Sequence, residues 1–175
     1  LNNLDNSGYS VSYAGDVNGD GIAEVSIGAP NANRTDVRSG QSYVVFGNAE
    51  GFDPSLELSA LNGSNGFLIN GVARGDRSGT SVSSAGDVNG DGIDDLIIGA
   101  PRRNFSSSGE SYIVFGTSTG FERQLDLSAL DGTNGFVVNG INEFDLSGIS
   151  VSAAGDVNGD GIDDLIIGAP GADPN

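Results

Sequence analysis

Residues 87–101 read Asp87-Val88-Asn89-Gly90-Asp91-Gly92-Ile93-Asp94-Asp95, followed at once by Leu96-Ile97-Ile98-Gly99-Ala100-Pro101. Oxygen-bearing side chains fall at the first, third, fifth and ninth positions of this segment. A Ca²⁺ ion takes six to eight oxygens at about 2.3–2.6 Å, and a tight loop can direct alternate side chains towards it. We therefore predict a calcium site formed by side-chain oxygens of Asp87, Asn89, Asp91 and Asp95 and by the backbone carbonyl of Ile93. Asp94 is expected to point away from the ion.

The loop begins like an EF-hand, but an EF-hand needs a bidentate Glu at its twelfth position and a helix on each side. Here the twelfth position is Ile98, inside a short apolar run that ends in Gly-Ala-Pro. Such a run is typical of a β-strand. We expect the ion in a turn between two strands, where Gly92 takes a positive φ. A dockerin module is excluded by the same argument.

The loop occurs three times. Residues 85–101 recur letter for letter as residues 154–170, and a looser copy covers residues 14–30. The ninth position of that looser copy is Glu24 instead of Asp, and its extra methylene is expected to make this site the weakest. Three calcium ions are predicted in total, and the ligands of the two further copies are Asp16, Asn18, Asp20, Ile22 and Glu24, and Asp156, Asn158, Asp160, Ile162 and Asp164.

The composition agrees with metal sites of this kind. The formal net charge is −17, with seven Arg and no Lys, and eleven of the 24 acidic residues lie inside the three loops. This charge argues against binding to nucleic acid or to an anionic membrane surface. The absence of Cys and His removes disulfides, thiolate metal sites and the commonest general base. Extracellular calcium modules bind at millimolar levels, so we expect an extracellular, secreted or cell-surface location.

The remaining segments predict an all-β protein built from repeats. First strands are expected at residues 9–17, 80–88 and 149–157, each followed by a calcium loop and a second strand. Third strands are expected at residues 41–46 and 110–115, and fourth strands at 67–69 and 136–138. Residues 56–61 and 125–130 read as helical turns. Four-stranded units repeated in this way predict a partial β-propeller over residues 1–175, with units at about 1–71, 72–140 and 141–175.

The segment Asp-Val-Asn-Gly-Asp-Gly-Ile-Asp-Asp-Leu-Ile-Ile-Gly-Ala-Pro resembles FG-GAP repeats, which are best known from the propeller of integrin α subunits. The resemblance extends over essentially the whole chain, because Tyr-x-Val-Phe-Gly also recurs in order. It implies antiparallel four-stranded blades, about two and a half of them, with structural calcium and with partners bound on other loops. One departure is that the usual Phe-Gly opening is Ser-Gly here, at Ser7, Ser78 and Ser147.

Several readings of function stay open. We favour a calcium-stabilised, non-enzymatic extracellular module for protein or matrix interaction and adhesion, with no catalytic residues. The alternatives are a subunit of an extracellular fibre or surface assembly, and an accessory domain of a larger secreted enzyme. A glycosidase role for paired acids such as Asp94 and Asp95 explains the spacing less well than metal binding does. The tripeptide Arg74-Gly75-Asp76 is read as a chance match, because Asp76 aligns with Asp5 and Asp145.

Ten strands are too few to close a propeller, which typically uses four to eight blades of four strands. A bare second strand in the last unit would be an aggregation template. We therefore expect further copies of this chain, or the rest of a longer chain of which this is a processed or excised piece, to cover the open blades.

Overall fold

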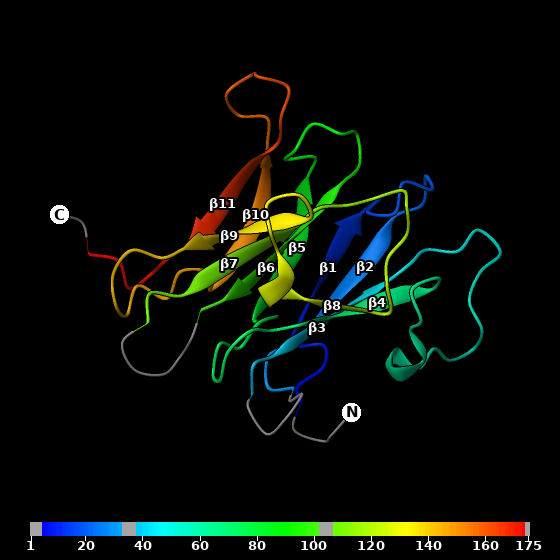
Figure 1. The fold of residues 1–175 in the computed structure, drawn as a ribbon, viewed down its shortest axis with the longest axis horizontal. Helices are drawn as coiled ribbons and strands as arrows, with labels where there is room; N and C mark the ends of the chain where they lie inside the picture. The colour runs from blue at the N-terminus through cyan, green and yellow to red at the C-terminus, as the bar shows by residue number, and fades with distance from the viewer. Residues whose placement is uncertain (1–4, 33–37, 102–106, 174–175) are drawn as a thin grey trace.

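The computed structural model describes residues 5–32, 38–101 and 107–173. Within these ranges the chain forms eleven β-strands and two short 3₁₀ helices (Figure 1). The strands are β1 (Ser10–Gly15), β2 (Glu24–Ala29), β3 (Gln41–Val45), β4 (Gly66–Asn70), β5 (Ser81–Gly86), β6 (Asp95–Ala100), β7 (Glu110–Val114), β8 (Gln124–Asp126), β9 (Gly135–Asn139), β10 (Ser150–Gly155) and β11 (Asp164–Gly168). The 3₁₀ helices are η1 (Leu58–Ala60) and η2 (Leu127–Ala129).

The strands assemble into three sheets that follow the repeats. Blade 1 consists of β1-β2-β3-β4, blade 2 of β5-β6-β7-β9, and blade 3 of β10-β11, and all neighbours within each blade are antiparallel. The first strands of the blades lie side by side, with β5 between β1 and β10. The prediction of an all-β fold with four-stranded antiparallel blades of the propeller type is confirmed.

The first strand of every blade ends in an irregularity that leads into the predicted calcium loop. Register shifts occur between Tyr13 and Gly15, between Ser84 and Gly86, and between Ala153 and Gly155. Glycine is suited to the end of such a bulge because it adopts positive φ without steric cost. The three bulges turn the chain in the same way, so the three loops leave their blades on the same side, the upper side in Figure 1.

One segment differs from the sequence prediction. Residues 125–130 were expected to form a helical turn, yet Gln124–Asp126 is a strand, β8, and only Leu127–Ala129 is helical. β8 runs parallel to β4 of blade 1, with Leu125 opposite Ile69. The matching residues of the first repeat contain η1 but no strand. The backbone of 124–126 is extended because β4 offers it hydrogen-bonding groups, a partner that no local propensity can reveal.

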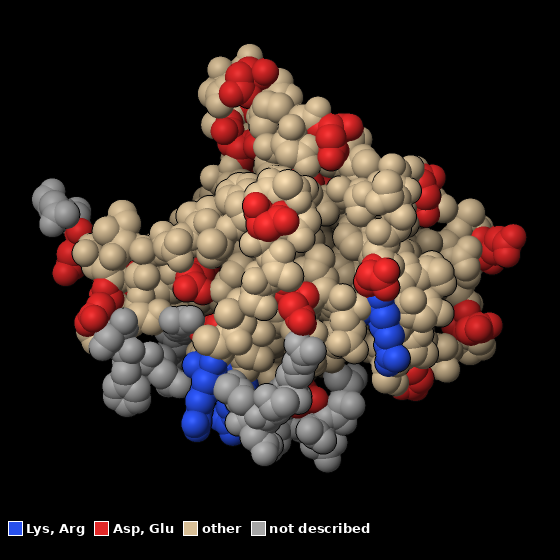
Figure 2. Space-filling model, in the orientation of Figure 1, with Lys and Arg blue, Asp and Glu red and all other residues tan. Residues whose placement is uncertain are grey.

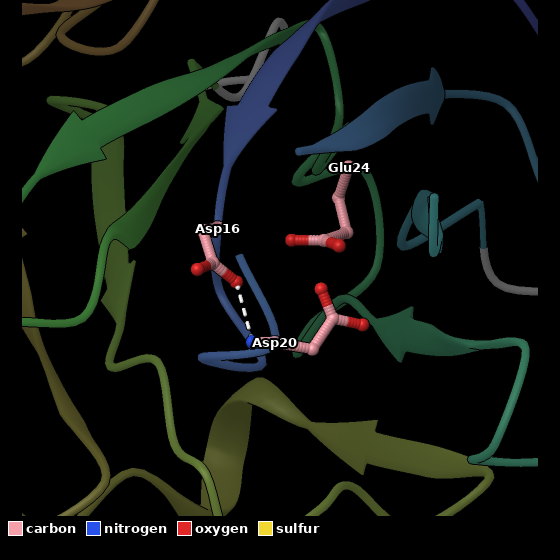
Figure 3. Close-up of side chains that lie close together, drawn as sticks. All are labelled: Asp16, Asp20 and Glu24. Carbon is pink, nitrogen blue, oxygen red and sulfur yellow. Dashed lines mark hydrogen bonds between the residues drawn. The ribbon is translucent and has the colours of Figure 1, made fainter. Parts of the chain in front are cut away.

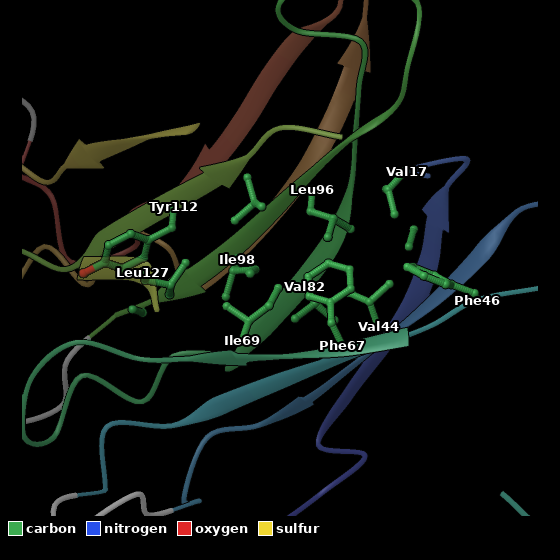
Figure 4. Packing of buried hydrophobic residues seen from close by; sticks show 13 residues of the cluster. Val17, Val44, Phe46, Phe67, Ile69, Val82, Leu96, Ile98, Tyr112 and Leu127 are labelled. Atoms are coloured by element: carbon green, nitrogen blue, oxygen red, sulfur yellow. The ribbon is translucent and has the colours of Figure 1, made fainter. Parts of the chain in front are cut away.

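The main core lies between blades 1 and 2 (Figure 4). Val44, Phe67 and Ile69 of blade 1 belong to the same buried cluster as Leu96 and Ile98 of blade 2. Phe121, from the connection between β7 and β8, stacks on Phe67 with ring centroids 4.1 Å apart. This cluster fixes the position of one blade, and therefore of one predicted calcium loop, relative to the next.

The aromatic residues that recur in the repeats differ in their burial. Tyr43, Phe67 and Tyr112 are buried, whereas Phe136 on β9 is partly exposed. Phe136 packs on Phe115 with ring centroids 5.9 Å apart, but no described segment covers the outer side of β9. The difference therefore reflects the neighbours of the two blades and not the residue type.

Among the described residues, no helix is both long enough and apolar enough to cross a bilayer.

Candidate metal centres

Each candidate centre is the tight connection between the first and second strands of a blade. We call residues 16–24 loop 1, residues 87–95 loop 2 and residues 156–164 loop 3. They join β1 to β2, β5 to β6 and β10 to β11 (Figure 1). Gly90 and Gly92 have φ values of 77° and 87°, which confirms the reversal expected at Gly92. An L side chain would be strained at both positions.

In loop 2 the first three predicted side-chain ligands accept hydrogen bonds from the backbone of the loop. The Asp87 carboxylate accepts from the N–H groups of Gly90 at 2.7 Å and Gly92 at 2.8 Å. Asn89 Oδ1 accepts from the Asp91 N–H at 2.9 Å, and Asp91 Oδ1 accepts from the Ile93 N–H at 2.9 Å. These bonds wrap the backbone of the loop around the side chains at its first, third and fifth positions.

Loops 1 and 3 repeat this pattern with their own residues. In loop 1 the Asp16 carboxylate accepts from the Gly21 N–H at 2.8 Å, and Asp20 Oδ1 accepts from the Ile22 N–H at 2.8 Å. In loop 3 the Asp156 carboxylate accepts from the Gly161 N–H at 2.8 Å, and Asp160 Oδ1 accepts from the Ile162 N–H at 2.9 Å. Asn18 and Asn158 also accept from the residue two positions later, as Asn89 does.

The acid at the ninth position closes each loop from the second strand. Asp95 is fully buried, and its carboxylate accepts from the N–H groups of Val88 at 3.0 Å and Gly116 at 2.8 Å. Glu24 and Asp164 accept from the matching Val17 and Val157 N–H groups at 2.7 and 2.9 Å. These bonds leave lone pairs on the carboxylate oxygens available to a cation.

Loop 1 brings three carboxylates together (Figure 3). Ligand oxygens of Asp16, Asp20 and Glu24 all lie within 4.8 Å of one another. Among the described residues, loops 2 and 3 hold no such group of three carboxylates, and the lower calcium affinity expected from the extra methylene of Glu24 stays a prediction. Carboxylate oxygens with amide and backbone carbonyl oxygens beside them are the donors that Ca²⁺ prefers, so the donor set fits a hard divalent cation.

The pKa values of the acids at the ninth position of loops 1 and 2 also fit a bound cation. Burial raises the pKa of Glu24 to about 7, and the nearby charges of Asp16 and Asp20 add to the rise, while the Val17 N–H opposes it. Burial likewise raises the pKa of Asp95 to about 6, against the Gly116 and Val88 N–H groups. A bound divalent cation would offset both the burial and the repulsion, because an adjacent positive charge favours the ionised carboxylate.

Two acids in the loops have a role that the sequence analysis did not identify. Asp94, at the eighth position of loop 2, was expected to point away from the ion of its own loop, and Asp163 holds the same position in loop 3. Each reaches to the preceding loop: Asp94 Oδ2 accepts from the Asp16 N–H at 2.9 Å, and Asp163 Oδ2 accepts from the Asp87 N–H at 3.0 Å. One indication in the sequence is that the eighth position of loop 1 is Ala23, whereas loops 2 and 3 have an acid at that position.

Acidic residues are spread over the face shown in Figure 2, with one group at the top, where Figure 1 has the β10–β11 loop. Basic residues are few on this face and lie in its lower half. Around the loops the surface is therefore strongly negative, which favours the approach of cations.

The Arg74-Gly75-Asp76 tripeptide lies in the turn before β5. Asp76 is fully buried, and its carboxylate accepts a hydrogen bond from the Ala73 N–H. In the third repeat Asp145 makes the same bond to the Asn142 N–H, at 2.8 Å, without an Arg-Gly before it. The carboxylate is thus part of the turn and is turned away from solvent.

Comparison with known families and proteins agrees with this geometry. The FG-GAP repeat family matches residues 7–45, 78–114 and 147–175. Each matched segment includes one of the three loops.

Several characterised proteins are similar over nearly the whole chain. Integrin alpha-PS5 of Drosophila melanogaster is 36% identical over 171 residues, which cover 95% of this chain and 15% of that protein. Integrin alpha-5 of Xenopus laevis is 32% identical over 171 residues, 95% of this chain and 15% of that protein. Phosphatidylinositol-glycan-specific phospholipase D of Bos taurus is 30% identical over 167 residues, 93% of this chain and 18% of that protein. The chain therefore spans less than a fifth of each of these relatives.

Proposed function

Because the chain belongs to the FG-GAP repeat family, we propose that it is a calcium-binding extracellular β-propeller module that mediates protein or matrix interaction and adhesion. The observation that carries this proposal is the threefold loop, whose side chains are held in the same hydrogen-bonded arrangement in every blade. The similarity to two integrin alpha subunits supports the adhesive role. Calcium is structural here, and the module has no catalytic role.

Each loop binds one Ca²⁺ through its first, third, fifth and ninth side chains and through the carbonyl at its seventh position. The compact group of carboxylates in loop 1 supports this donor set. Calcium neutralises carboxylates that burial and mutual repulsion would otherwise make costly to ionise. The bound ion thereby fixes the turn between the first two strands and the position of those strands in the blade.

The repeat units at residues 1–71, 72–140 and 141–175 form one partial propeller domain. The outer strand of blade 2, β9, has no strand on its outer side among the described residues, and Ile166 of β11 is exposed. Apolar faces and unpaired strand edges of this kind associate unless they are covered. Further blades, from the rest of a longer chain or from further copies of this one, cover them.

Calorimetric titration of the full chain with Ca²⁺ tests the metal sites. We expect three equivalents to bind, and a variant with Asp20→Ala, Asp91→Ala and Asp160→Ala to bind calcium about tenfold or more weakly at every loop. Solid-phase binding to a panel of purified extracellular matrix proteins, with and without calcium, tests the interaction role. Failure of the chain to bind Ca²⁺ in the millimolar range would contradict the proposal at its first step.

A second candidate function rests on the similarity to a phosphatidylinositol-glycan-specific phospholipase D. The module would then be an accessory domain of a secreted enzyme, and the chemistry would belong to another part of the polypeptide. Assay of the complete protein for release of glycan-anchored proteins from membranes separates this candidate from adhesion. The third candidate, a subunit of an extracellular fibre or surface assembly, predicts long regular particles in calcium buffer, which electron microscopy detects.

A further inference from the structure

Loops 1 and 2 are joined by a reciprocal pair of hydrogen bonds that involves Asp94. Its carboxylate Oδ2 accepts from the Asp16 N–H at 2.9 Å, and its own N–H donates to the Asp16 carbonyl oxygen at 3.3 Å. Asp163 repeats both bonds with Asp87, at 3.0 and 3.1 Å. In each case the acid contacts the first residue of the neighbouring loop, which is a proposed calcium ligand.

Glycines make room for these contacts. A Cβ atom at Gly15 would overlap the Asp94 side chain, and one at Gly86 would overlap the Asp163 side chain. At Gly155, which holds the same position before loop 3, an added Cβ would meet nothing within 4 Å among the described residues. Two loops thus receive a carboxylate from the next blade, at a place where any larger residue would exclude it.

A second path joins loops 1 and 2 through their closing acids. Glu24 Oε2 accepts from the Val17 N–H at 2.7 Å, and the Val17 carbonyl oxygen accepts from the Thr117 N–H at 2.9 Å. The preceding residue of blade 2, Gly116, donates its N–H to Asp95 Oδ1 at 2.8 Å. A continuous set of backbone and carboxylate groups therefore connects a ligand of loop 1 with a ligand of loop 2.

We propose that Asp94 and Asp163 are positioning residues that couple neighbouring calcium loops, so that calcium in one loop raises the affinity of the next. This inference rests on the proposed function, because it presupposes that the loops bind calcium. It adds that the ions enter the propeller cooperatively, blade by blade, and that acids outside the ligand set carry the coupling.

The physical basis is the shared cost of ordering the loops. Calcium at loop 1 fixes the backbone of Asp16, and the reciprocal bonds then hold Asp94 beside the ligand Asp95. Loop 2 consequently loses less conformational freedom when its own ion binds, which is positive coupling without a change of fold. A hydrogen bond from N–H to an ionised carboxylate is stronger than a neutral one, so the Asp side chain suits this task.

The number of links predicts which pair is coupled more strongly. Loops 1 and 2 are joined by the Asp94 contact and by the Thr117–Val17 bond. Loops 2 and 3 are joined, among the described residues, by the Asp163 contact without a counterpart of the second path. We expect the stronger coupling between loops 1 and 2.

Residue-resolved NMR titration of the full chain with Ca²⁺ tests this proposal, since each loop has two glycine amides that report on its own ion. These pairs are Gly19 and Gly21, Gly90 and Gly92, and Gly159 and Gly161. Emptying loop 2 with Asp91→Ala should weaken calcium binding at loop 1 by about fivefold or more, the lower range of measured couplings. In an Asp94→Ala background the same change should have a smaller effect on loop 1, because only the path through Thr117 and Val17 still joins the two loops.

Control variants separate coupling from general effects. Asp94→Ala should weaken loop 1 and leave loop 3 unchanged, whereas Asp163→Ala should weaken loop 2. Glu143→Gln removes one negative charge from an exposed position away from the loops and should change none of them. If Asp94→Ala unfolds, Asp94→Asn takes its place: its amide oxygen is a weaker, uncharged acceptor for the Asp16 N–H, so the coupling should fall in part.

The outcomes distinguish the two levels of the proposal. Loops that bind calcium with affinities independent of Asp91→Ala would overturn the coupling and leave the calcium sites intact. Loops that bind no calcium at all would overturn both. An effect of Asp91→Ala on loop 1 that is clearly smaller in the Asp94→Ala background would support the coupling through Asp94.

Discussion

Val82 and Val11 occupy the same position on the first strands of blades 2 and 1, yet their surroundings differ. Val82 is 7% exposed and Val11 is 65% exposed. On the second strands, the matching residues Leu96 and Val25 are 2% and 47% exposed. Blade 1 covers the first residue of each pair, whereas no described segment covers the second. The two faces thus have similar apolar residues. These residues are buried where a neighbouring blade covers them and exposed where no described segment does.

The same comparison applies to the loops. Loops 1 and 2 share their first seven residues, but loop 1 ends in Ala23-Glu24 and loop 2 in Asp94-Asp95. Loop 1 therefore receives a carboxylate from the neighbouring blade and contributes none, whereas loop 2 does both. The loops therefore become different sites through their last two residues and through what lies beside them.

Blades 1 and 2 each contain a proposed calcium loop. Removing calcium should therefore have the largest effect on the stability of the fold. At calcium concentrations about ten- to a hundredfold above Kd, each site stabilises the fold by roughly 1.4–2.7 kcal/mol. Three sites then contribute about 4–8 kcal/mol, comparable with the ~5–15 kcal/mol stability of a typical domain. We expect a large fall in Tm when EDTA is added, measured by circular dichroism. A melting curve that EDTA does not change would show that calcium is not structural.

The matched substitutions Val82→Ala and Val11→Ala test the difference between the two faces. Val82→Ala removes buried methyl groups and should lower the free energy of unfolding by about 2 kcal/mol. Val11→Ala should change it by about 0.5 kcal/mol or less, because its side chain is mostly exposed. Urea denaturation of both variants in calcium, at low protein concentration, measures the two effects. Equal losses would mean that a second copy of the chain covers the face of blade 1 in solution.

Within loop 2, Asp91→Ala should weaken calcium binding more than Asp94→Ala does. Asp91 is a proposed ligand, and losing a charged ligand should cost that loop about tenfold or more in affinity, or about 1.4 kcal/mol. Asp94 lies outside the ligand set of its own loop and bonds to Asp16. Titration calorimetry compares the two variants, and an equal loss at loop 2 would mean that the ligand assignment is wrong.

The closing acids predict that loops 1 and 2 respond differently to pH. The folded-state pKa of Glu24, about 7, and that of Asp95, about 6, both lie above their usual values. A raised carboxyl pKa means that the calcium-free fold holds a proton that the unfolded chain has released. The calcium-free fold is therefore most stable below the usual carboxyl pKa, and it loses that stability as pH rises through these values.

Protons also compete with calcium at these carboxylates, so affinity falls as pH falls. Between pH 8 and pH 6, loop 1 should lose roughly tenfold in calcium affinity and loop 2 roughly twofold, because a proton competes in proportion to its occupancy. NMR titration of the loop glycines at the two pH values measures both losses in one sample. Equal losses at the two loops would contradict the difference between their closing acids.

Much of this architecture follows from the sequence because its signals are local. The run Leu96-Ile97-Ile98 between a calcium loop and Gly-Ala-Pro forms the central strand β6, as predicted. The oxygens at odd positions are drawn together by backbone N–H groups two to five residues away, which a spacing argument can anticipate. Repetition adds strength, since the same pattern is found in every blade.

What the sequence could not predict depends on residues far apart in the chain. β8 becomes a strand only because β4, more than fifty residues earlier, lies next to it. Asp94 finds its partner in another blade, so no motif within loop 2 reveals its role. The partial exposure of Phe136 likewise follows from the lack of a described neighbour and not from its repeat position.

The smallest effect is expected at the Arg74-Gly75-Asp76 turn, where the second and third repeats can be compared directly. Asp76 and Asp145 are both buried, and each accepts a hydrogen bond from the backbone three residues earlier. Arg74 is exposed, and its counterpart in the third repeat is Glu143. The Asp carboxylate therefore belongs to a turn that forms with or without the preceding Arg-Gly, and it is not presented to a receptor.

Cell attachment to the immobilised chain should consequently be the same for the unmodified protein and for Arg74→Glu, which introduces the residue found in the third repeat. The substitution is at an exposed side chain, so the fold should be retained, and circular dichroism checks that it is. Asp76→Glu serves as the second variant, because it lengthens the acidic side chain that an integrin-type receptor would have to bind. Attachment that disappears in both variants, with their folds intact, would show that the tripeptide leaves its turn to bind a receptor.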